Sequence, residues 1–127
     1  MGSIYIVDDD PGARESLCQL LSVFPIHEVK TFSSGIAFAE SAAGLPPGVV
    51  LLDHHMPKLT GLELLQMRQV HDRHVTIVIT GMGNPAMAAT AKQRGAFDFI
   101  EKPYPPGQLL DAIARAMARL DGDKADG

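Results

Sequence analysis

Short apolar runs alternate with helix-length amphipathic segments five times along this chain of 127 residues. This alternation predicts repeated strand–helix units, and it favours a parallel sheet over hairpins because parallel strands need a long crossover connection. The expected strands are residues 4–7, 27–31, 49–52, 76–79 and 97–100. The third and fourth are almost entirely apolar, which is typical of central strands covered on both faces. The pattern therefore predicts a single α/β domain.

Five helices are expected to follow the strands. The first begins at Asp10-Pro11, where an acidic cap precedes a proline at the first helical position, and Pro25 ends it. The others cover about 33–43, a segment after Gly61, about 84–95 and about 106–120. Residues 121–127 are small and charged, so we expect a frayed tail or a linker stub there. The domain is accordingly assigned to residues 1–120.

Charge and composition exclude several classes of protein. The formal net charge of -4 argues against direct nucleic-acid binding, because phosphate backbones are bound by an excess of Lys and Arg. No apolar run approaches the roughly 20 residues that span a bilayer. The only cysteine, Cys18, has no internal disulfide partner, and no signal segment precedes the first apolar run. We therefore expect a cytoplasmic protein without a membrane partner.

Carboxylates follow two of the expected strands. Asp8 and Asp9 come directly after the first strand and Asp53 after the third, so they converge if these strands are neighbours. Carboxylates packed together repel one another unless a cation lies among them, and Mg²⁺ (or Mn²⁺) prefers such oxygen ligands. Asp10 is instead expected to cap the helix that follows. The simpler alternative to a metal site is that Asp8, Asp9 and Asp10 form only a helix cap, with solvated carboxylates near the positive end of that helix. Asp53, at the end of an apolar strand, favours the metal site.

Two further strand ends carry groups that fit phosphoryl transfer. A carboxylate such as Asp53 can accept a phosphoryl group as an acyl phosphate. Lys102, after the fifth strand, supplies a compact positive charge, and Thr80, after the fourth, supplies a hydroxyl donor. Each residue alone is unremarkable, since a lone Lys usually faces solvent. Their joint placement predicts a phosphoryl-transfer site.

These motifs resemble the receiver domain of two-component response regulators, over about residues 3 to 120. They are Ile6-Val7-Asp8-Asp9, Asp53-x-x-Met56-Pro57 with Gly61, Val78-Ile79-Thr80-Gly81, and Phe97-Asp98-Phe99-Ile100-Glu101-Lys102-Pro103. The last two stretches are most similar to the FixJ-type, LuxR/NarL-like subgroup, whose members usually carry a C-terminal helix-turn-helix. The resemblance implies a flavodoxin-like (βα)5 three-layer sandwich with a parallel five-stranded sheet in the order 2-1-3-4-5.

The resemblance also implies one role for each matching position. It assigns phosphoacceptance to Asp53, magnesium binding to Asp8, Asp9, Asp53 and the backbone carbonyl of His55, phosphate pairing to Lys102, the conformational switch to Thr80 and Phe99, and a cis peptide bond to Pro103. Catalysis is then restricted to the domain's own phosphorylation and dephosphorylation, for which Lys102 and Thr80 are the catalytic groups.

The implied partners are a sensor histidine kinase and, after phosphorylation, a second copy of the chain. The dimer would form through the segments 84–95, 97–100 and 106–120. The implied output is transcription control through a C-terminal DNA-binding domain absent from this chain, because this domain itself does not contact nucleic acid. A free-standing receiver in a phosphorelay is the alternative.

Two other classes of protein share parts of the pattern. A haloacid-dehalogenase-type phosphatase would use Asp8-x-Asp10, Thr80 and Lys102, but no acidic pair follows Lys102 and Asp53 would have no purpose. A flavodoxin-like module that binds a nucleotide or flavin would need a glycine- and hydroxyl-rich loop after the first strand, where this chain has aspartates.

The sequence differs at His54-His55 from the residues common in receiver domains. A bulky imidazole at His55, together with the apolar Met82 two residues after Thr80, would disfavour an ordered attacking water, so we hypothesise slow autodephosphorylation. A zinc site at this histidine pair is disfavoured, because adjacent residues seldom both face one metal.

Overall fold

The computed structural model describes residues 2–23, 28–54, 56, 59–81 and 85–126. The strands are β1 (Ser3–Val7), β2 (Glu28–Phe32), β3 (Gly48–Asp53), β4 (Val75–Thr80) and β5 (Asp98–Glu101). The helices are α1 (Pro11–Leu21), α2 (Gly35–Ala42), α3 (Gly61–Leu65), α4 (Arg68–His71), α5 (Pro85–Gln93) and α6 (Pro106–Asp126). All five predicted strands are present, each shifted or extended by one or two residues.

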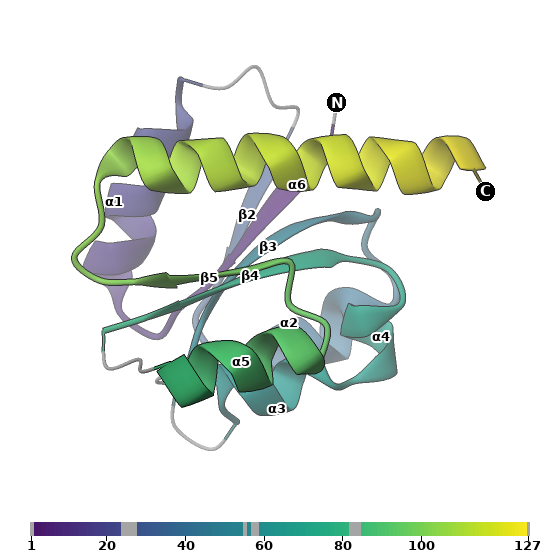
Figure 1. Ribbon diagram of the computed structural model, residues 1–127, viewed down its shortest axis with the longest axis horizontal. Coiled ribbons are helices and arrows are strands. Elements are labelled where there is room, and N and C mark those ends of the chain that lie inside the picture. The colour runs from purple at the N-terminus through teal and green to yellow at the C-terminus, as the bar shows by residue number, and fades with distance from the viewer. Residues whose placement is uncertain (1, 24–27, 55, 57–58, 82–84, 127) are drawn as a thin grey trace.

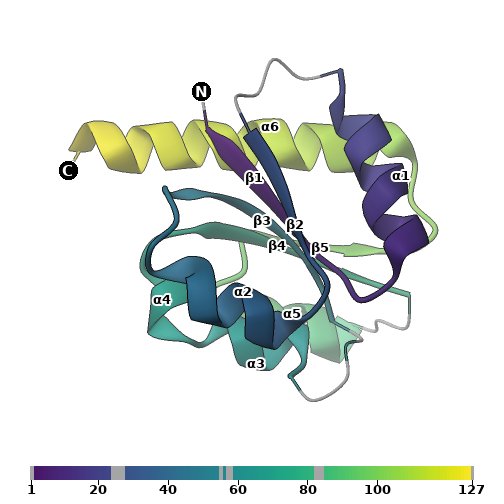
Figure 2. The ribbon, with the colours of Figure 1, turned by 180° about the vertical axis from the view of Figure 1, so that it is seen from behind.

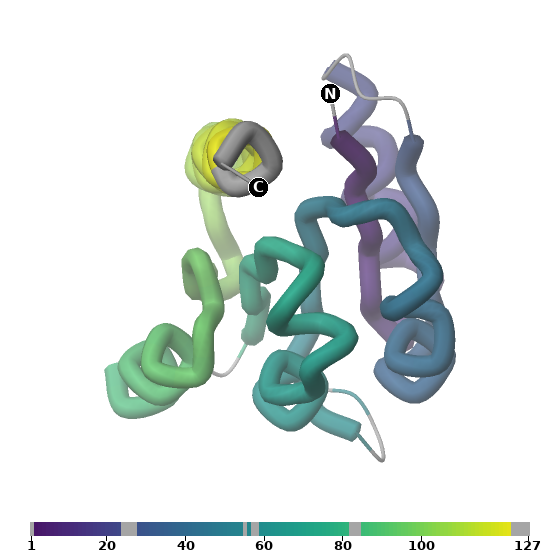
Figure 3. Tube along the Cα trace, turned by 90° about the vertical axis from the view of Figure 1, so that its right-hand side faces the viewer, coloured from purple at the N-terminus to yellow at the C-terminus, as the bar shows by residue number. Residues whose placement is uncertain are grey.

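The strands form one parallel sheet in the order β2-β1-β3-β4-β5, which confirms the predicted order. Helices α1 and α6 cover one face, and α2, α3, α4 and α5 cover the other (Figure 1), as the reverse view also shows (Figure 2). In the view along α6, the two helical layers lie on opposite sides of the sheet (Figure 3). Because all the strands run the same way, their carboxyl ends meet at one edge and their amino ends at the other.

Strand residues alternate between the two apolar layers. Ile4 and Ile6 of β1 belong to the cluster formed with α1 and α6, whereas Tyr5 and Val7 belong to the cluster formed with α2 and α3. Strands β1 and β3 are buried along their whole length, as the central position of a sheet covered on both faces requires. The edge strand β2 is largely exposed.

Two helix predictions differ from the structure. The helix expected after Gly61 is divided into α3 and α4, because Met67 adopts an extended conformation with ψ 134° and interrupts the helical hydrogen bonds. The last helix continues to Asp126, six residues beyond the expected end at Leu120 (Figure 1). Extending a helix that is already anchored costs less than starting one, so one glycine does not end it. The expectation of a frayed tail is thus wrong for residues 121–126. Within the described ranges, no helix is long and apolar enough to cross a membrane.

A buried histidine joins two loops at the amino edge of the sheet. His74 precedes β4 and is 6% exposed. Its Nδ1 accepts a hydrogen bond from the Gly48 N–H at 3.1 Å, so the ring proton lies on Nε2, which donates to the Ala42 carbonyl at 3.0 Å. The neutral imidazole therefore connects the end of α2 to the start of β3.

Two further side chains donate to carbonyls of the same connection. The Tyr5 hydroxyl donates to Pro46 at 2.6 Å, and Arg73 Nη2 donates to Leu45 at 2.7 Å. The Tyr5 ring also meets the His74 ring edge to face, with 5.4 Å between their centroids. A side chain from the middle of β1 and one from the segment before β4 thus satisfy two carbonyl groups of the loop between α2 and β3.

Acid is expected to destabilise the protein through His74. Burial lowers the pKa of His74 below its ordinary value, and the nearby Arg73 charge lowers it further. The unfolded chain therefore takes up the proton first, near pH 6.5, so the stability provided by the neutral ring is lost as the pH falls from there toward the folded pKa. Urea unfolding at about pH 7.5, 6.5 and 5.5 should show that the free energy of unfolding falls more steeply with decreasing pH for the native chain than for His74→Gln. Parallel pH profiles for the two proteins would contradict this assignment.

Candidate functional site

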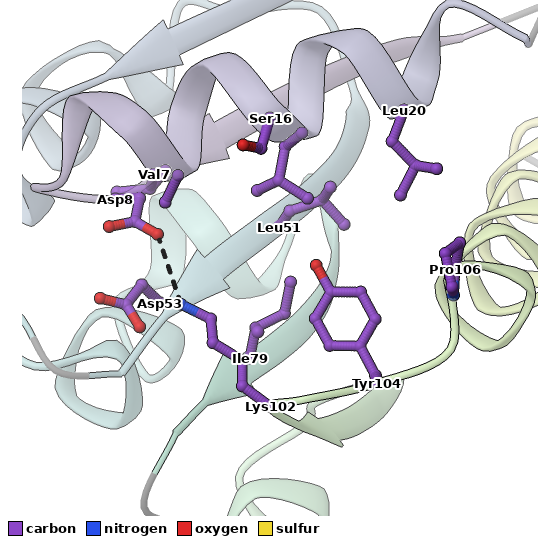
Figure 4. A pocket seen from close by; sticks show the side chains of 12 residues that line it. Val7, Asp8, Ser16, Leu20, Leu51, Asp53, Ile79, Lys102, Tyr104 and Pro106 are labelled. Atoms are coloured by element: carbon purple, nitrogen blue, oxygen red, sulfur yellow. Dashed lines mark ion pairs between the residues drawn. The ribbon is translucent and has the colours of Figure 1, made fainter.

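Three carboxylates meet at the carboxyl edge of the sheet. Asp8 directly follows β1 and Asp53 ends β3, and the two strands are paired in register. Both side chains are buried, whereas Asp9 is exposed. One oxygen atom from each of the three lies within 4.8 Å of the others. The structure thus brings together the acidic groups that the sequence predicted (Figure 4, which labels Asp8 and Asp53).

The loop after β1 fixes the Asp8 carboxylate. The Asp10 N–H donates to Asp8 Oδ1 at 3.0 Å, and Arg14 Nη1 donates to the Asp8 backbone carbonyl at 2.7 Å. Asp10 itself accepts hydrogen bonds from the N–H groups of Gly12 and Ala13. Its predicted role as the cap of α1 is therefore confirmed, and its side chain is engaged with the helix.

Lysine and threonine complete the cluster. Lys102 directly follows β5, and its Nζ lies 3.9 Å from Asp8 Oδ2 (Figure 4). Its backbone N–H donates to the Thr80 carbonyl at 2.8 Å, which places the two residues on adjoining strand ends. Thr80 is fully buried. The Lys102–Pro103 peptide bond is cis, the geometry that the resemblance implied.

Phe99 lies on the same face of the sheet as Thr80. It pairs in register with Val78, which precedes Thr80 by two residues, and side chains alternate along a strand. Phe99 is half-buried and packs against a cluster that includes Leu65 of α3 and Ala91 of α5. Phe99 therefore packs against α5 on the face of the sheet that carries Thr80.

The chain after Asp53 folds back closely on itself. The His54 carbonyl accepts hydrogen bonds from the N–H groups of Met56 at 3.0 Å and Gly61 at 3.2 Å. A Cβ atom on Gly61 would lie 2.9 Å from the His54 Cα and 3.0 Å from the Asp53 carbonyl oxygen. Only glycine fits here without moving the backbone that carries Asp53.

Burial dominates the electrostatics of Asp8. It raises the pKa of this carboxyl above the ordinary value, while the Asp10 N–H and the Lys102 charge act in the opposite direction. The neighbouring charges of Asp9 and Asp10 raise the pKa further. The ionised carboxylate is therefore incompletely compensated, which is the condition that a bound cation relieves.

Replacing Asp8 by asparagine should raise the melting temperature of the metal-free protein at pH 7 by a few degrees. The folded pKa lies above the unfolded value of about 3.9, so the stability contribution of Asp8 is present below that value and is lost as the pH rises through the folded pKa. The gain should therefore shrink toward pH ~3.5. Scanning fluorimetry with chelator tests this, with the exposed Glu15→Gln as the control, and an unchanged Asp8→Asn melting temperature would contradict it.

A cavity of about 420 Å³ adjoins the carboxylates, between α1 and the segment that joins β5 to α6. Asp8, Asp53 and Lys102 line one end of it, and Tyr104 lines the other side (Figure 4). Burial and the Asp8 charge raise the pKa of Tyr104. Sequence reasoning missed this residue, although an aromatic side chain two positions after a site lysine was a usable signal.

Some predictions fall on residues outside those described. These are the carbonyl of His55, the side chain of Met82 and the Pro57 position of the third motif. The magnesium contact of His55 and the slow autodephosphorylation stay predictions.

A parallel sheet in this order, with paired carboxylates and a lysine at its carboxyl edge, is the architecture of a receiver module. The chain belongs to the response regulator receiver domain family, whose model matches residues 4–114. The earlier resemblance is therefore confirmed, and the protein is a receiver domain of response regulators.

Individual relatives support the FixJ-type assignment. The transcriptional regulatory protein FixJ of Rhizobium meliloti is 39% identical over 127 residues, covering 98% of this chain and 61% of FixJ. The C4-dicarboxylate transport transcriptional regulatory protein DctD of Pseudomonas aeruginosa is 38% identical, covering 90% of this chain and 25% of DctD. The crystal structure of FixJ-N matches with a TM-score of 0.80 and 39% identity, over 91% of this chain and 93% of that one. This chain thus spans between a quarter and about three-fifths of these two curated relatives.

Proposed function

We propose that Asp53 accepts a phosphoryl group from the phosphohistidine of a sensor histidine kinase. The observation that carries this proposal is the convergence of Asp8, Asp9 and Asp53 within 4.8 Å, with Lys102 Nζ 3.9 Å from Asp8. A buried carboxylate at a strand end, beside a cation site and a lysine, is the arrangement that nucleophilic phosphoryl transfer needs. The family membership supports the same role.

The three carboxylates fit a magnesium ion. They are hard oxygen donors, and burial raises the pKa of Asp8, so a bound cation would favour its ionised form. Asp8, Asp9 and Asp53 would hold the ion, and Mn²⁺ would fit the same donors. When bound, Mg²⁺ neutralises the carboxylates and the incoming phosphoryl oxygens.

Asp53, Lys102 and Thr80 then have separate roles in phosphoryl transfer. An Asp53 oxygen attacks phosphorus while the phosphorus–nitrogen bond to the kinase histidine breaks, and the histidine nitrogen keeps the electron pair. Lys102 leaves Asp8 to pair with the phosphoryl oxygens, and the Thr80 hydroxyl donates a hydrogen bond to them. In this proposal the domain catalyses only the phosphorylation of its own Asp53 and the hydrolysis of the resulting aspartyl phosphate.

Phosphorylation would change the surface formed by α5, β5 and α6. It adds nearly two negative charges beside Thr80 and Lys102. Movement of Thr80 toward these charges vacates space on the face that it shares with Phe99, and rotation of that ring alters the packing against α5. This surface would then support a homodimer.

The relatives named as transcriptional regulators support an output through a C-terminal DNA-binding domain, and a free-standing receiver in a phosphorelay is the second candidate. The proposal places the protein in the cytoplasm. The exposed free thiol of Cys18 suits a reducing compartment.

Incubation with acetyl phosphate and Mg²⁺ tests the proposed function. Intact-mass spectrometry should show the gain of one phosphoryl group, and peptide mapping should locate it on Asp53. Chelation of the metal should abolish the gain, because the carboxylates then repel the donor. An adduct that forms equally well without divalent metal, or on another residue, would overturn the assignment.

A further inference from the structure

The cavity beside the carboxylates is chemically different from the phosphorylation site that it adjoins. Apolar side chains form most of its wall: Leu17 and Leu20 of α1, Leu51 of β3, Ile79 of β4 and the ring of Tyr104. Its volume of about 420 Å³ falls within the range of ordinary small-molecule sites, about 300–1,000 Å³. The wall therefore suits an apolar body that phosphoryl transfer itself does not require.

The apolar wall of the cavity favours a neutral ligand over a charged one. Lys102, Asp8 and Asp53 lie together at one end of the cavity, where Lys102 Nζ pairs with Asp8 (Figure 4). The charges of both signs at this end are already paired with one another, and the rest of the cavity wall offers no charged partner to a ligand. Burying an unpaired charge of either sign among the apolar side chains would add a large desolvation cost.

Two hydroxyl groups supply the remaining polar chemistry of the cavity. Ser16 lines it from α1, and the Tyr104 hydroxyl points into it from the opposite side (Figure 4). A hydroxyl both donates and accepts, so either residue can hold one polar group of a ligand in a fixed orientation. The Tyr104 ring offers an aromatic surface on which a ligand ring can pack.

From these features we infer that the cavity between α1 and the β5–α6 segment binds a small, neutral aromatic molecule that carries one hydroxyl or similar hydrogen-bonding group. The ring lies among Leu20, Leu51 and Tyr104, and the polar group meets Ser16 or Tyr104. An apolar protein cavity of about 150 Å³ already accommodates benzene, so space is not limiting. The inference is independent of phosphoryl transfer.

Three probes of nearly the same shape test the ligand class on the full chain: benzyl alcohol, benzylammonium and benzoate. Methyl resonances of Leu17, Leu20, Leu51 and Ile79 are followed by NMR during each titration. Benzyl alcohol should shift them to saturation with a Kd of roughly 1 mM, as suits so small a ligand. Each charged probe should bind at least about tenfold more weakly, because its charge must be desolvated.

Variants of α1 test the location. Leu20→Trp fills the cavity and should abolish the shifts caused by benzyl alcohol, whereas Gln19→Trp places the same ring on the exposed side of α1 and should preserve them. Ser16→Ala retains the fold and should weaken binding about threefold if Ser16 holds the ligand hydroxyl, with Tyr104→Phe as its counterpart. If benzyl alcohol binds both hydroxyl variants as tightly as it binds the native chain, the polar part of the inference is overturned.

Two other outcomes would contradict the inference. One is the absence of saturable shifts at these methyl groups, and the other is equal or tighter binding of a charged probe. Phosphorylation by acetyl phosphate, measured on the same samples, reports separately on Asp53. A chain that gains a phosphoryl group but does not bind benzyl alcohol contradicts only the cavity inference, and the reverse result contradicts only the proposed function.

Discussion

Asp53→Asn is expected to reduce phosphorylation by acetyl phosphate to below detection. The amide lacks the ionised oxygen that attacks phosphorus, so the loss is of the nucleophile itself. Asp8→Asn keeps that nucleophile and removes one carboxylate from the cluster, so phosphorylation should persist at a rate about 100-fold lower. The gain in intact mass over time, at fixed Mg²⁺, measures both rates. Glu15→Gln on the exposed side of α1 is the matched control and should react like the native chain.

The opposite ranking would revive the phosphatase interpretation. In that case the nucleophile would be Asp8, so Asp8→Asn would lose the acyl phosphate and Asp53→Asn would keep it. The structure already weakens this alternative, because both oxygens of Asp10 accept hydrogen bonds from the first turn of α1. The second aspartate of a D-x-D motif would have to leave that cap to act on a substrate.

Gly48→Ala should destabilise the fold by about 3 kcal/mol, the upper part of the usual range for overpacking. A Cβ atom at Gly48 would lie 2.6 Å from the Ser3 carbonyl oxygen and 2.7 Å from Cε2 of the Tyr5 ring. Neither neighbour can move easily, since Ser3 pairs with Gly48 in the sheet and Tyr5 is fully buried. The same shift would disturb the hydrogen bond from Gly48 to His74. Urea unfolding at pH 7.5 measures the difference.

Gly107→Ala is the control for this prediction. Among the described residues, no atom lies within 4 Å of a Cβ built at Gly107, in the first turn of α6. Alanine there should be neutral or stabilise the protein by up to about 1 kcal/mol, because it restricts the unfolded chain. Equal stability of Gly48→Ala and the native chain would show that β1 and β3 can separate without cost.

The strands could be predicted because their causes are local, whereas their order came from the resemblance to receiver domains. Apolar runs such as 49–52 are short and lie between turn residues, so they mark buried strands without reference to the rest of the chain. The division into α3 and α4 could not be predicted in this way, because it depends on the extended backbone of Met67. The end of α6 was missed for a related reason: Gly122 resembles a stop signal, but the anchored helix continues through it.

The candidate site was predictable to the extent that it consists of strand ends. Asp8 and Lys102 each follow a strand and Asp53 ends one, so the parallel arrangement alone brings them to one edge. The cavity was not predictable, because it depends on how far α1 lies from Tyr104 across the sheet. The contacts of His74 with Ala42 and Gly48 could not be predicted either, because each joins residues at least 26 positions apart.

Because the strands are parallel and extended, substitutions at the amino edge and at the carboxyl edge of the sheet are expected to affect the free energy of unfolding independently. Strand β3 begins at Gly48 and ends at Asp53, and five residue steps at about 3.3 Å each put these positions roughly 16 Å apart. Sites so far apart with no shared partner usually act additively, within about 0.5 kcal/mol. The double variant Gly48→Ala, Asp53→Asn should therefore have the summed effect of the single variants on the free energy of unfolding. The amino edge could then be engineered for stability while the chemistry at the carboxyl edge stays unchanged.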